Sequence, residues 1–187
     1  MILESYPWKE DLLKMAKLID RYNTPSHFRW NSEKTYYNLE KTIFTSAFII
    51  RKLIDCKKVS DEVEFYRFDK LLKYKSAKKF DNIHKWIDDK SYEWGKHAKV
   101  SLCARYICNS LIHSLIFGFS FQNDKVYSFF IASDKDKDSF LLEIPLNLWV
   151  NYMTYVGEDD IEFLEVKCDK NNSLVFKKKR KTLISDI

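Results

Sequence analysis

The sequence has 187 residues, of which 45% are hydrophobic, 16% aromatic and 32% charged, with three glycines and three prolines. This composition excludes a disordered chain, and it predicts one globular domain over residues 1–187 with a packed core inside a charged surface. The longest apolar run, residues 43–54, is interrupted by polar residues and is shorter than the roughly 20 residues of a spanning helix, so we expect no membrane contact.

The start of the chain and the cysteines indicate a cytoplasmic protein. Residues 1–4 lack the cationic start and apolar core of a secretory signal. The four cysteines form no Cys-x-x-Cys pair and have no closely spaced histidines, so we interpret them as reduced core residues rather than disulfides or metal ligands. They are Cys56, Cys103, Cys108 and Cys168. The sequence contains no phosphate-binding loop or dinucleotide-binding motif, so we expect no cofactor.

The net charge of +5 is concentrated in two basic tracts. The first consists of Lys70, Lys73, Lys75, Lys78 and Lys79, and the second of Lys177, Lys178, Lys179, Arg180 and Lys181. Neither tract contains an acidic residue, and together they predict sites that bind an anionic partner, with nucleic acid as the first candidate. The alternative is that the tracts form a solvated helix face and a basic tail over residues 180–187.

The first part of the chain is mainly helical in pattern. Apolar residues at helical spacing predict three helices, the second of which should be the central buried one. These helices are expected over residues 7–22, over residues 32–58 and from residue 92 or 96 to residue 113. We expect a loop through residues 27–30 and a short strand over the aromatic and β-branched residues 62–68. Residues 70–90 are interpreted as a basic, partly helical connection.

After residue 114 apolar and polar residues alternate, which is typical of strands. The expected elements are strands over residues 115–122, 127–131 and 140–144, a helix over 146–156, and a hairpin that pairs 161–167 with 174–177 across a turn at 169–172. Helices first and strands later predict an α+β fold. N-terminal helices, mainly residues 1–114, should pack on a C-terminal antiparallel sheet, mainly residues 114–179, made of a meander, one inserted helix and the final hairpin.

Three polar residues of the third helix are candidate catalytic residues. Arg105, Asn109 and His113 follow at i, i+4 and i+8 in a nearly all-apolar pattern, so they share one stripe of the helix. An arginine can hold a phosphate, a histidine can transfer a proton near neutral pH, and an asparagine can orient either group. The structural alternative is that all three satisfy hydrogen bonds where the helix meets the sheet.

Residues 109–113 resemble the second half of the Arg-x(4–6)-His signature of HEPN ribonucleases. The residue before Asn109 is Cys108 instead of arginine, and Arg105 lies eight residues before His113. A predicted sheet also follows where that all-helical fold has another helix. The resemblance therefore implies only a ribonuclease-like use of Arg105 and His113.

Two further patterns concern metal ions. Glu165 and Lys167 resemble the acid-x-lysine element of metal-dependent nucleases of the restriction-endonuclease type, in which carboxylates hold Mg²⁺. The alternative is the solvent-facing side of an antiparallel strand. Residues 134–138 have the alternating aspartates of an EF-hand loop, but serine and proline replace the glycine and glutamate that calcium binding needs, so no metal site is expected there.

These patterns favour a small intracellular binding protein without catalytic activity, whose basic tracts bind an anionic partner such as nucleic acid. In that case the aromatic residues within 28–30 and 66–68, which lie beside basic ones, would stack on bases. The first alternative is a protein-interaction or homo-oligomerising module, in which apolar helix and sheet faces close against another copy. The second alternative is a ribonuclease-like enzyme that uses Arg105 and His113.

Overall fold

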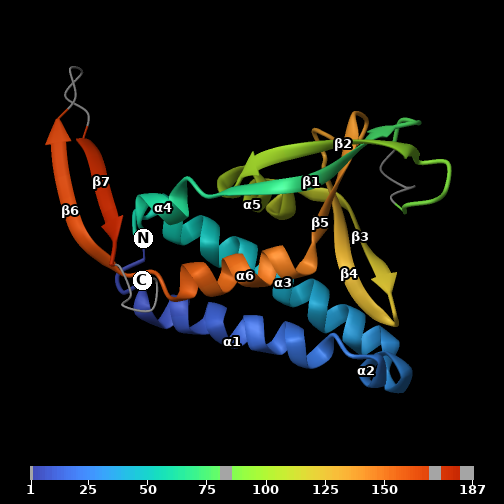
Figure 1. Ribbon diagram of the computed structural model, residues 1–187, viewed down its shortest axis with the longest axis horizontal. Coiled ribbons are helices and arrows are strands. Elements are labelled where there is room, and N and C mark those ends of the chain that lie inside the picture. The colour runs from blue at the N-terminus through green and yellow to red at the C-terminus, as the bar shows by residue number, and fades with distance from the viewer. Residues whose placement is uncertain (1, 81–85, 169–173, 182–187) are drawn as a thin grey trace.

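The chain folds into an α+β structure in which helices cover one side of an antiparallel sheet (Figure 1). The computed structural model describes residues 2–80, 86–168 and 174–181. The helices are α1 (Tyr6–Tyr22), α2 (Pro25–Trp30), α3 (Ser32–Asp55), α4 (Asp61–Glu64), α5 (Ala104–Ile112) and α6 (Leu146–Gly157). The strands are β1 (Arg67–Ser76), β2 (Tyr92–Cys103), β3 (Ser114–Gln122), β4 (Lys125–Ser133), β5 (Phe140–Pro145), β6 (Ile161–Cys168) and β7 (Leu174–Arg180).

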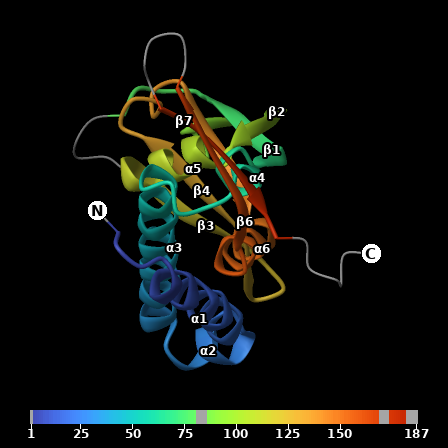
Figure 2. The same ribbon diagram turned by 90° about the vertical axis from the view of Figure 1, so that its left-hand side faces the viewer.

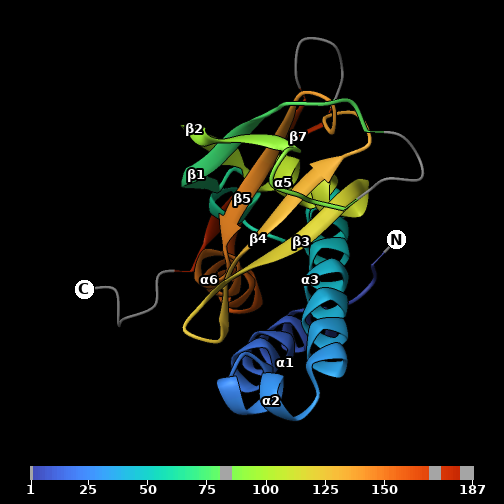
Figure 3. The same ribbon diagram turned by 90° about the vertical axis from the view of Figure 1, so that its right-hand side faces the viewer.

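Five strands form one sheet in the order β2-β1-β5-β4-β3, which can be followed in Figure 3. β3 and β4 are joined by a tight turn in which Asn123 and Asp124 have φ angles of 53° and 56°. Asparagine and aspartate tolerate this left-handed conformation, and two such residues match the twist of the strands that they join. β5 pairs with both β1 and β4, so it connects the β1–β2 hairpin to the β3–β4 hairpin.

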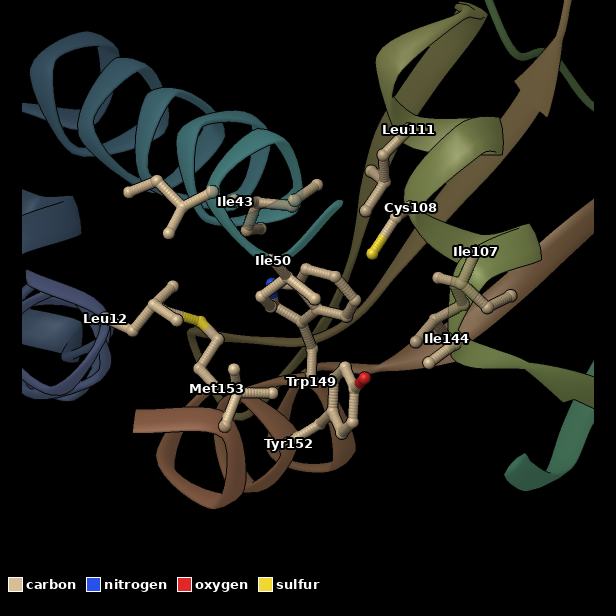
Figure 4. Packing of buried hydrophobic residues seen from close by; sticks show 14 of the residues in the cluster. Leu12, Ile43, Ile50, Ile107, Cys108, Leu111, Ile144, Trp149, Tyr152 and Met153 are labelled. Carbon is tan, nitrogen blue, oxygen red and sulfur yellow. The ribbon is translucent and has the colours of Figure 1, made fainter. Parts of the chain in front are cut away.

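The helix-covered face of the sheet holds the main core, in which Trp149 and Tyr152 of α6 are buried (Figure 4). The indole Nε1 of Trp149 donates to Ser46 Oγ of α3 at 3.1 Å. The hydroxyl of Tyr152 donates to the carbonyl of Val63 in α4 at 3.0 Å. Because the polar atoms of both rings find partners, the rings can be buried without a desolvation penalty for an unpaired group.

The opposite face of the sheet carries a second, smaller core. Tyr74 of β1 and Leu141 of β5 are paired across the sheet and both are buried. Phe80, which follows β1, and Tyr92, the first residue of β2, stack with ring centroids 5.4 Å apart and belong to this core. Burial on both faces explains why β5 is a nearly continuous apolar run.

Strands β6 and β7 form a separate hairpin, as Figure 2 shows from its side of the molecule. An isolated two-stranded hairpin is marginally stable in water, but this one is attached to the body by buried polar contacts. Asp159, which precedes β6, accepts hydrogen bonds from the backbone N and the Oγ of Ser60 at 2.9 and 2.6 Å. In β7, the Nζ of buried Lys178 lies 3.2 Å from Glu64 Oε2.

The α+β class and most of the long elements expected from the sequence are confirmed. The helices expected over residues 7–22, 32–58 and 146–156 correspond to α1, α3 and α6, and the meander and final hairpin correspond to β3, β4, β5, β6 and β7. The turn expected at residues 169–172 and most of the expected basic tail lie outside the described residues. Within the described part of the chain, no helix combines the length and apolar character needed to span a membrane.

The differences from the expected elements lie between residues 25 and 103. Residues 25–30 form α2 instead of a loop, and residues 61–64 form α4, where a strand was expected. Residues 70–76 of the basic connection expected over residues 70–90 belong to β1, and the first half of the third expected helix is β2. β1 and β2 pair with each other, so their conformation depends on a partner strand that a local apolar period does not reveal.

Candidate functional site

A basic groove of about 650 Å³ lies along β1, β2 and the start of β5. We call it the β1–β2 groove. Its charged lining consists of Lys73, Lys75, Lys96 and Glu93. The remaining lining residues are His97, Ala98, Val100, Ser139 and Phe140. Three ammonium groups from two strands therefore converge on a surface whose other lining residues, apart from Glu93, are apolar or uncharged.

The pairing of the strands explains why these lysines share one groove. Lys73 is paired with Ala98 of β2 and with Leu142 of β5. Since Leu142 belongs to the main core, the groove lies on the helix-covered side of the sheet. The Nζ of Lys73 is 3.8 Å from the centroid of the Phe140 ring, where the face of the ring attracts the ammonium.

Glu93, the acidic residue of the groove, leaves Lys75 able to bind an anionic ligand. Lys75 Nζ lies 3.6 Å from Glu93 Oε1, and the side chain of Lys75 is 75% exposed. An exposed ion pair of this kind contributes little to stability and is screened by salt. An anionic ligand can therefore displace Glu93 at small cost.

The other members of the first basic tract lie outside the groove. Lys70 and Lys79 are exposed, and Lys78 is bonded to Asp88 at 2.8 Å. The hydrogen bond from Lys78 is the largest cause that lowers the pKa of the Asp88 carboxyl to about 2. Lys96 also lines the groove, although the sequence pattern did not indicate it, because residue 96 was expected to lie in or just before a helix.

The second basic tract alternates between the two sides of β7. Lys178 is only 1% exposed, and Arg180 places its guanidinium carbon 4.0 Å from the centroid of the Tyr155 ring. The exposed members are Lys177, Lys179 and Lys181. Lys178 and Arg180 therefore attach the hairpin to the body, and only the three exposed lysines are accessible to an anionic partner.

The structure separates the three residues of the expected catalytic stripe. Arg105 Nη1 lies 2.9 Å from Asp55 Oδ1, and its Nη2 lies 3.3 Å from Glu64 Oε1. Asn109 and His113 instead line a solvent-open hollow of about 370 Å³, of which Arg105 is not a lining residue. Of the three residues, only Asn109 and His113 are therefore placed to act on the same ligand.

This hollow, which we call the His113 hollow, lies between α5 and the connection from β4 to β5. Its lining includes Tyr106, Asn109, Ser110, His113, Ser133 and Asp136. Asp136 Oδ2 accepts hydrogen bonds from the Tyr106 hydroxyl at 2.9 Å and from Ser133 Oγ at 2.7 Å. Burial, followed by the bond to Asp136, raises the pKa of Tyr106 to about 12, so this phenol stays protonated and acts as a donor at neutral pH.

Two of the lining side chains are not used by the fold. Among the described residues, no side chain or backbone group bonds to the amide of Asn109, to the imidazole of His113 or to Oδ1 of Asp136. His113 is exposed at the end of α5, and Asn109 is half-buried one turn earlier. The hollow therefore presents an imidazole, an amide and a carboxylate oxygen to solvent.

The pair Glu165 and Lys167 is placed on the hairpin. Lys167 Nζ bonds to Glu165 Oε1 at 2.7 Å, and this bond is the largest cause that lowers the pKa of Glu165. Asp159, the acidic residue that precedes this strand, accepts hydrogen bonds from Ser60. The described residues contain no group of three or more histidine, cysteine, aspartate or glutamate side chains placed to hold a metal ion.

Most of the aromatic residues considered for base stacking belong to the core. Tyr66 stacks on Tyr152 with ring centroids 4.8 Å apart, and Phe68 is buried. Phe28 packs edge-on against Phe121. Trp30 is the exception, since 90% of its surface is exposed, but it lies on α2, outside the lining of the β1–β2 groove.

Comparison with protein-family models, with curated proteins and with solved structures finds no match to this chain. Any function assigned to it therefore rests on the geometry of the β1–β2 groove and the His113 hollow.

Proposed function

We propose that the chain binds single-stranded nucleic acid through the β1–β2 groove. The observation that carries the proposal is the convergence of Lys73, Lys75 and Lys96 on one groove. Glu93 is the single acidic residue in its described lining, and it is only weakly engaged. A surface that brings several ammonium groups together attracts a phosphate backbone and gains free energy from the counterions that the backbone releases.

The uncharged lining of the groove favours an unpaired strand. Phe140 brings an aromatic ring to the groove, and Val100 adds an apolar surface. The bases of a single strand are free to contact such a ring, whereas the bases of a duplex are stacked on one another. Because the Lys73 ammonium lies over the Phe140 ring, a phosphate bound by Lys73 would place a neighbouring base near that ring.

Fluorescence anisotropy with a labelled single-stranded oligonucleotide, repeated over a range of salt concentrations, tests this proposal. If the three lysines each neutralise one phosphate, the logarithm of the association constant should fall against the logarithm of salt concentration with a slope of about −2. The variant Lys73→Gln/Lys75→Gln/Lys96→Gln should lose most of the affinity and flatten this slope. An unlabelled duplex of the same sequence should compete poorly.

The hairpin supplies a matched control. The variant Lys177→Gln/Lys179→Gln/Lys181→Gln removes the same charge from exposed positions outside the groove and should leave the affinity and the slope nearly unchanged. Equal losses in both triple variants would show that net charge, rather than the groove, drives binding. Absence of binding by the unmodified chain at low salt would refute the proposal altogether.

A further inference from the structure

The His113 hollow lies next to the β1–β2 groove. The connection between β4 and β5 contributes to both, since residues 133–136 line the hollow and residues 139–140 line the groove. α5, which forms the other wall of the hollow, packs into the main core through Ile107 and so lies on the same side of the sheet as the groove. A strand bound in the groove therefore has the unused side chains of the hollow beside it.

The polar groups of the hollow are suited to moving protons. Asp136 is held by Tyr106 and Ser133 through one carboxylate oxygen, which leaves Oδ1 to accept a proton. His113 is exposed and unbonded within the described residues, and histidine is the side chain that gains and loses a proton near neutral pH. Tyr106 and Ser133 act as positioning residues for the carboxylate.

We propose that the His113 hollow cleaves RNA, an inference that rests on the proposed binding of a single strand in the groove. The ribose 2′-hydroxyl gives its proton to Asp136, and its oxygen forms a bond to the adjacent phosphorus. The bond from phosphorus to the 5′-oxygen breaks, and protonated His113 gives its proton to that oxygen. The products are a 2′,3′-cyclic phosphate and a 5′-hydroxyl. Proton exchange with water restores Asp136 and His113.

The same hollow offers groups that stabilise the charge of the reacting phosphate. The amide of Asn109 can donate to a non-bridging oxygen, and Lys135, which also lines the hollow, adds a positive charge. The nucleophile is part of the substrate, so the step needs no co-reactant. DNA lacks the 2′-hydroxyl and cannot follow this route, which makes RNA the substrate class.

Incubation of the full chain with end-labelled single-stranded RNA, with the same strand carrying 2′-O-methyl groups and with the corresponding DNA tests the proposal. Only the unmodified RNA should be cut, to fragments that end in a 2′,3′-cyclic phosphate. His113→Ala should slow cleavage by about 100-fold or more, the contribution typical of a general acid. The variant should still bind the methylated strand as tightly as the unmodified chain, because His113 lies outside the groove lining.

His27→Ala is the matched control for the loss of an imidazole. Its ring is bonded to Thr24 Oγ1 at 2.7 Å on α2 and does not line the His113 hollow, so cleavage should continue at the normal rate. Binding of the methylated strand without cleavage of RNA, or equal cleavage by His113→Ala, would overturn the cleavage site and leave the groove intact. Failure to bind the methylated strand would overturn the groove and, with it, this inference.

Discussion

Lys178 differs from its neighbours in the basic run because its ammonium is buried between β7 and α4. It lies 3.2 Å from Glu64 Oε2 and donates to the carbonyl of Val59. Burial raises the pKa of Glu64, but the hydrogen bonds from Lys57 and Lys178 outweigh it, and the net pKa is lowered. Since the folded pKa is lowered, Glu64 stabilises the fold above its unfolded pKa. That stabilisation is lost as the pH falls through the folded value.

Replacing Lys178 should therefore be costly. Lys178→Met should lower the free energy of unfolding by about 3 kcal/mol, at the lower end of the range for a broken buried pair because Lys57 and Arg105 still reach Glu64. Lys177→Met, at the exposed position before it, is the matched control and should change that free energy by less than about 0.5 kcal/mol. Urea unfolding at neutral pH measures both. The difference in free energy of unfolding between the unmodified chain and Lys178→Met should become smaller in acid, where Glu64 is protonated. Equal decreases in the two variants would contradict a structural role for Lys178.

At the scale of elements, α1 and α6 approach each other closely at Gly157, the last residue of α6. A Cβ at this position would lie 2.7 Å from Cγ of Leu13 and 3.1 Å from the carbonyl oxygen of Lys9. The carbonyl belongs to the backbone of α1, so the helix itself would have to move. The close approach of α1 and α6 therefore depends on glycine, which has no Cβ, at position 157.

We expect Gly157→Ala to cost about 1–3 kcal/mol, because the strain of overpacking exceeds the gain in helix propensity. Gly95→Ala is the control, since nothing lies within 4 Å of a Cβ at that position in β2. It should raise the free energy of unfolding by about 0.4–1 kcal/mol, because alanine lowers the conformational entropy of the unfolded chain. Thermal unfolding of both variants measures the difference. A gain in stability for Gly157→Ala would show that α1 shifts freely.

The helices could be predicted from the sequence where burial is confined to one face. α1 buries Leu12, Ala16 and Ile19 at helical spacing, and α3 does the same over a longer stretch. β1 and β2 could not be predicted in this way, because Lys73 takes a position that an interior strand such as β1 would fill with an apolar residue, and Lys96 lies on β2 at the edge of the sheet. These strands owe their conformation to pairing with each other and with β5, which is not a local property of the sequence.

The candidate site could likewise be predicted only where its residues are close together in the sequence. Asn109 and His113 lie on and directly after a short helix, so their local spacing was enough to bring them together. Arg105 has the same spacing, but Asp55 and Glu64 hold its guanidinium from segments that are distant in sequence. Asp136 lines the hollow because β4, which precedes it, packs against α5. Its place in the candidate site therefore depends on the tertiary fold and could not be predicted from local spacing.

The molecule as a whole has buried tyrosines in both cores and a half-buried tyrosine in the His113 hollow. Tyr152 lies in the main core, Tyr74 and Tyr92 lie in the second core, and Tyr106 lies in the hollow. Burial is the largest cause that raises the pKa of each ring. For Tyr74 the hydrogen bond to Glu143, at 2.6 Å, raises the pKa further. All four rings are therefore neutral in the folded state well into alkaline solution.

In the unfolded chain these rings have a pKa of about 10, the ordinary value for tyrosine. Because their folded pKa values are raised, the stabilisation they provide is complete below about pH 10 and is lost as the pH rises toward the folded values. We expect phenolate absorbance from the four rings to appear together with the loss of circular dichroism. Tyr106→Phe should reduce this joint step by one tyrosine, whereas Tyr37→Phe, at a ring that is 58% exposed, should leave it unchanged. Phenolate absorbance that precedes unfolding would show that solvent reaches the two cores in the folded state.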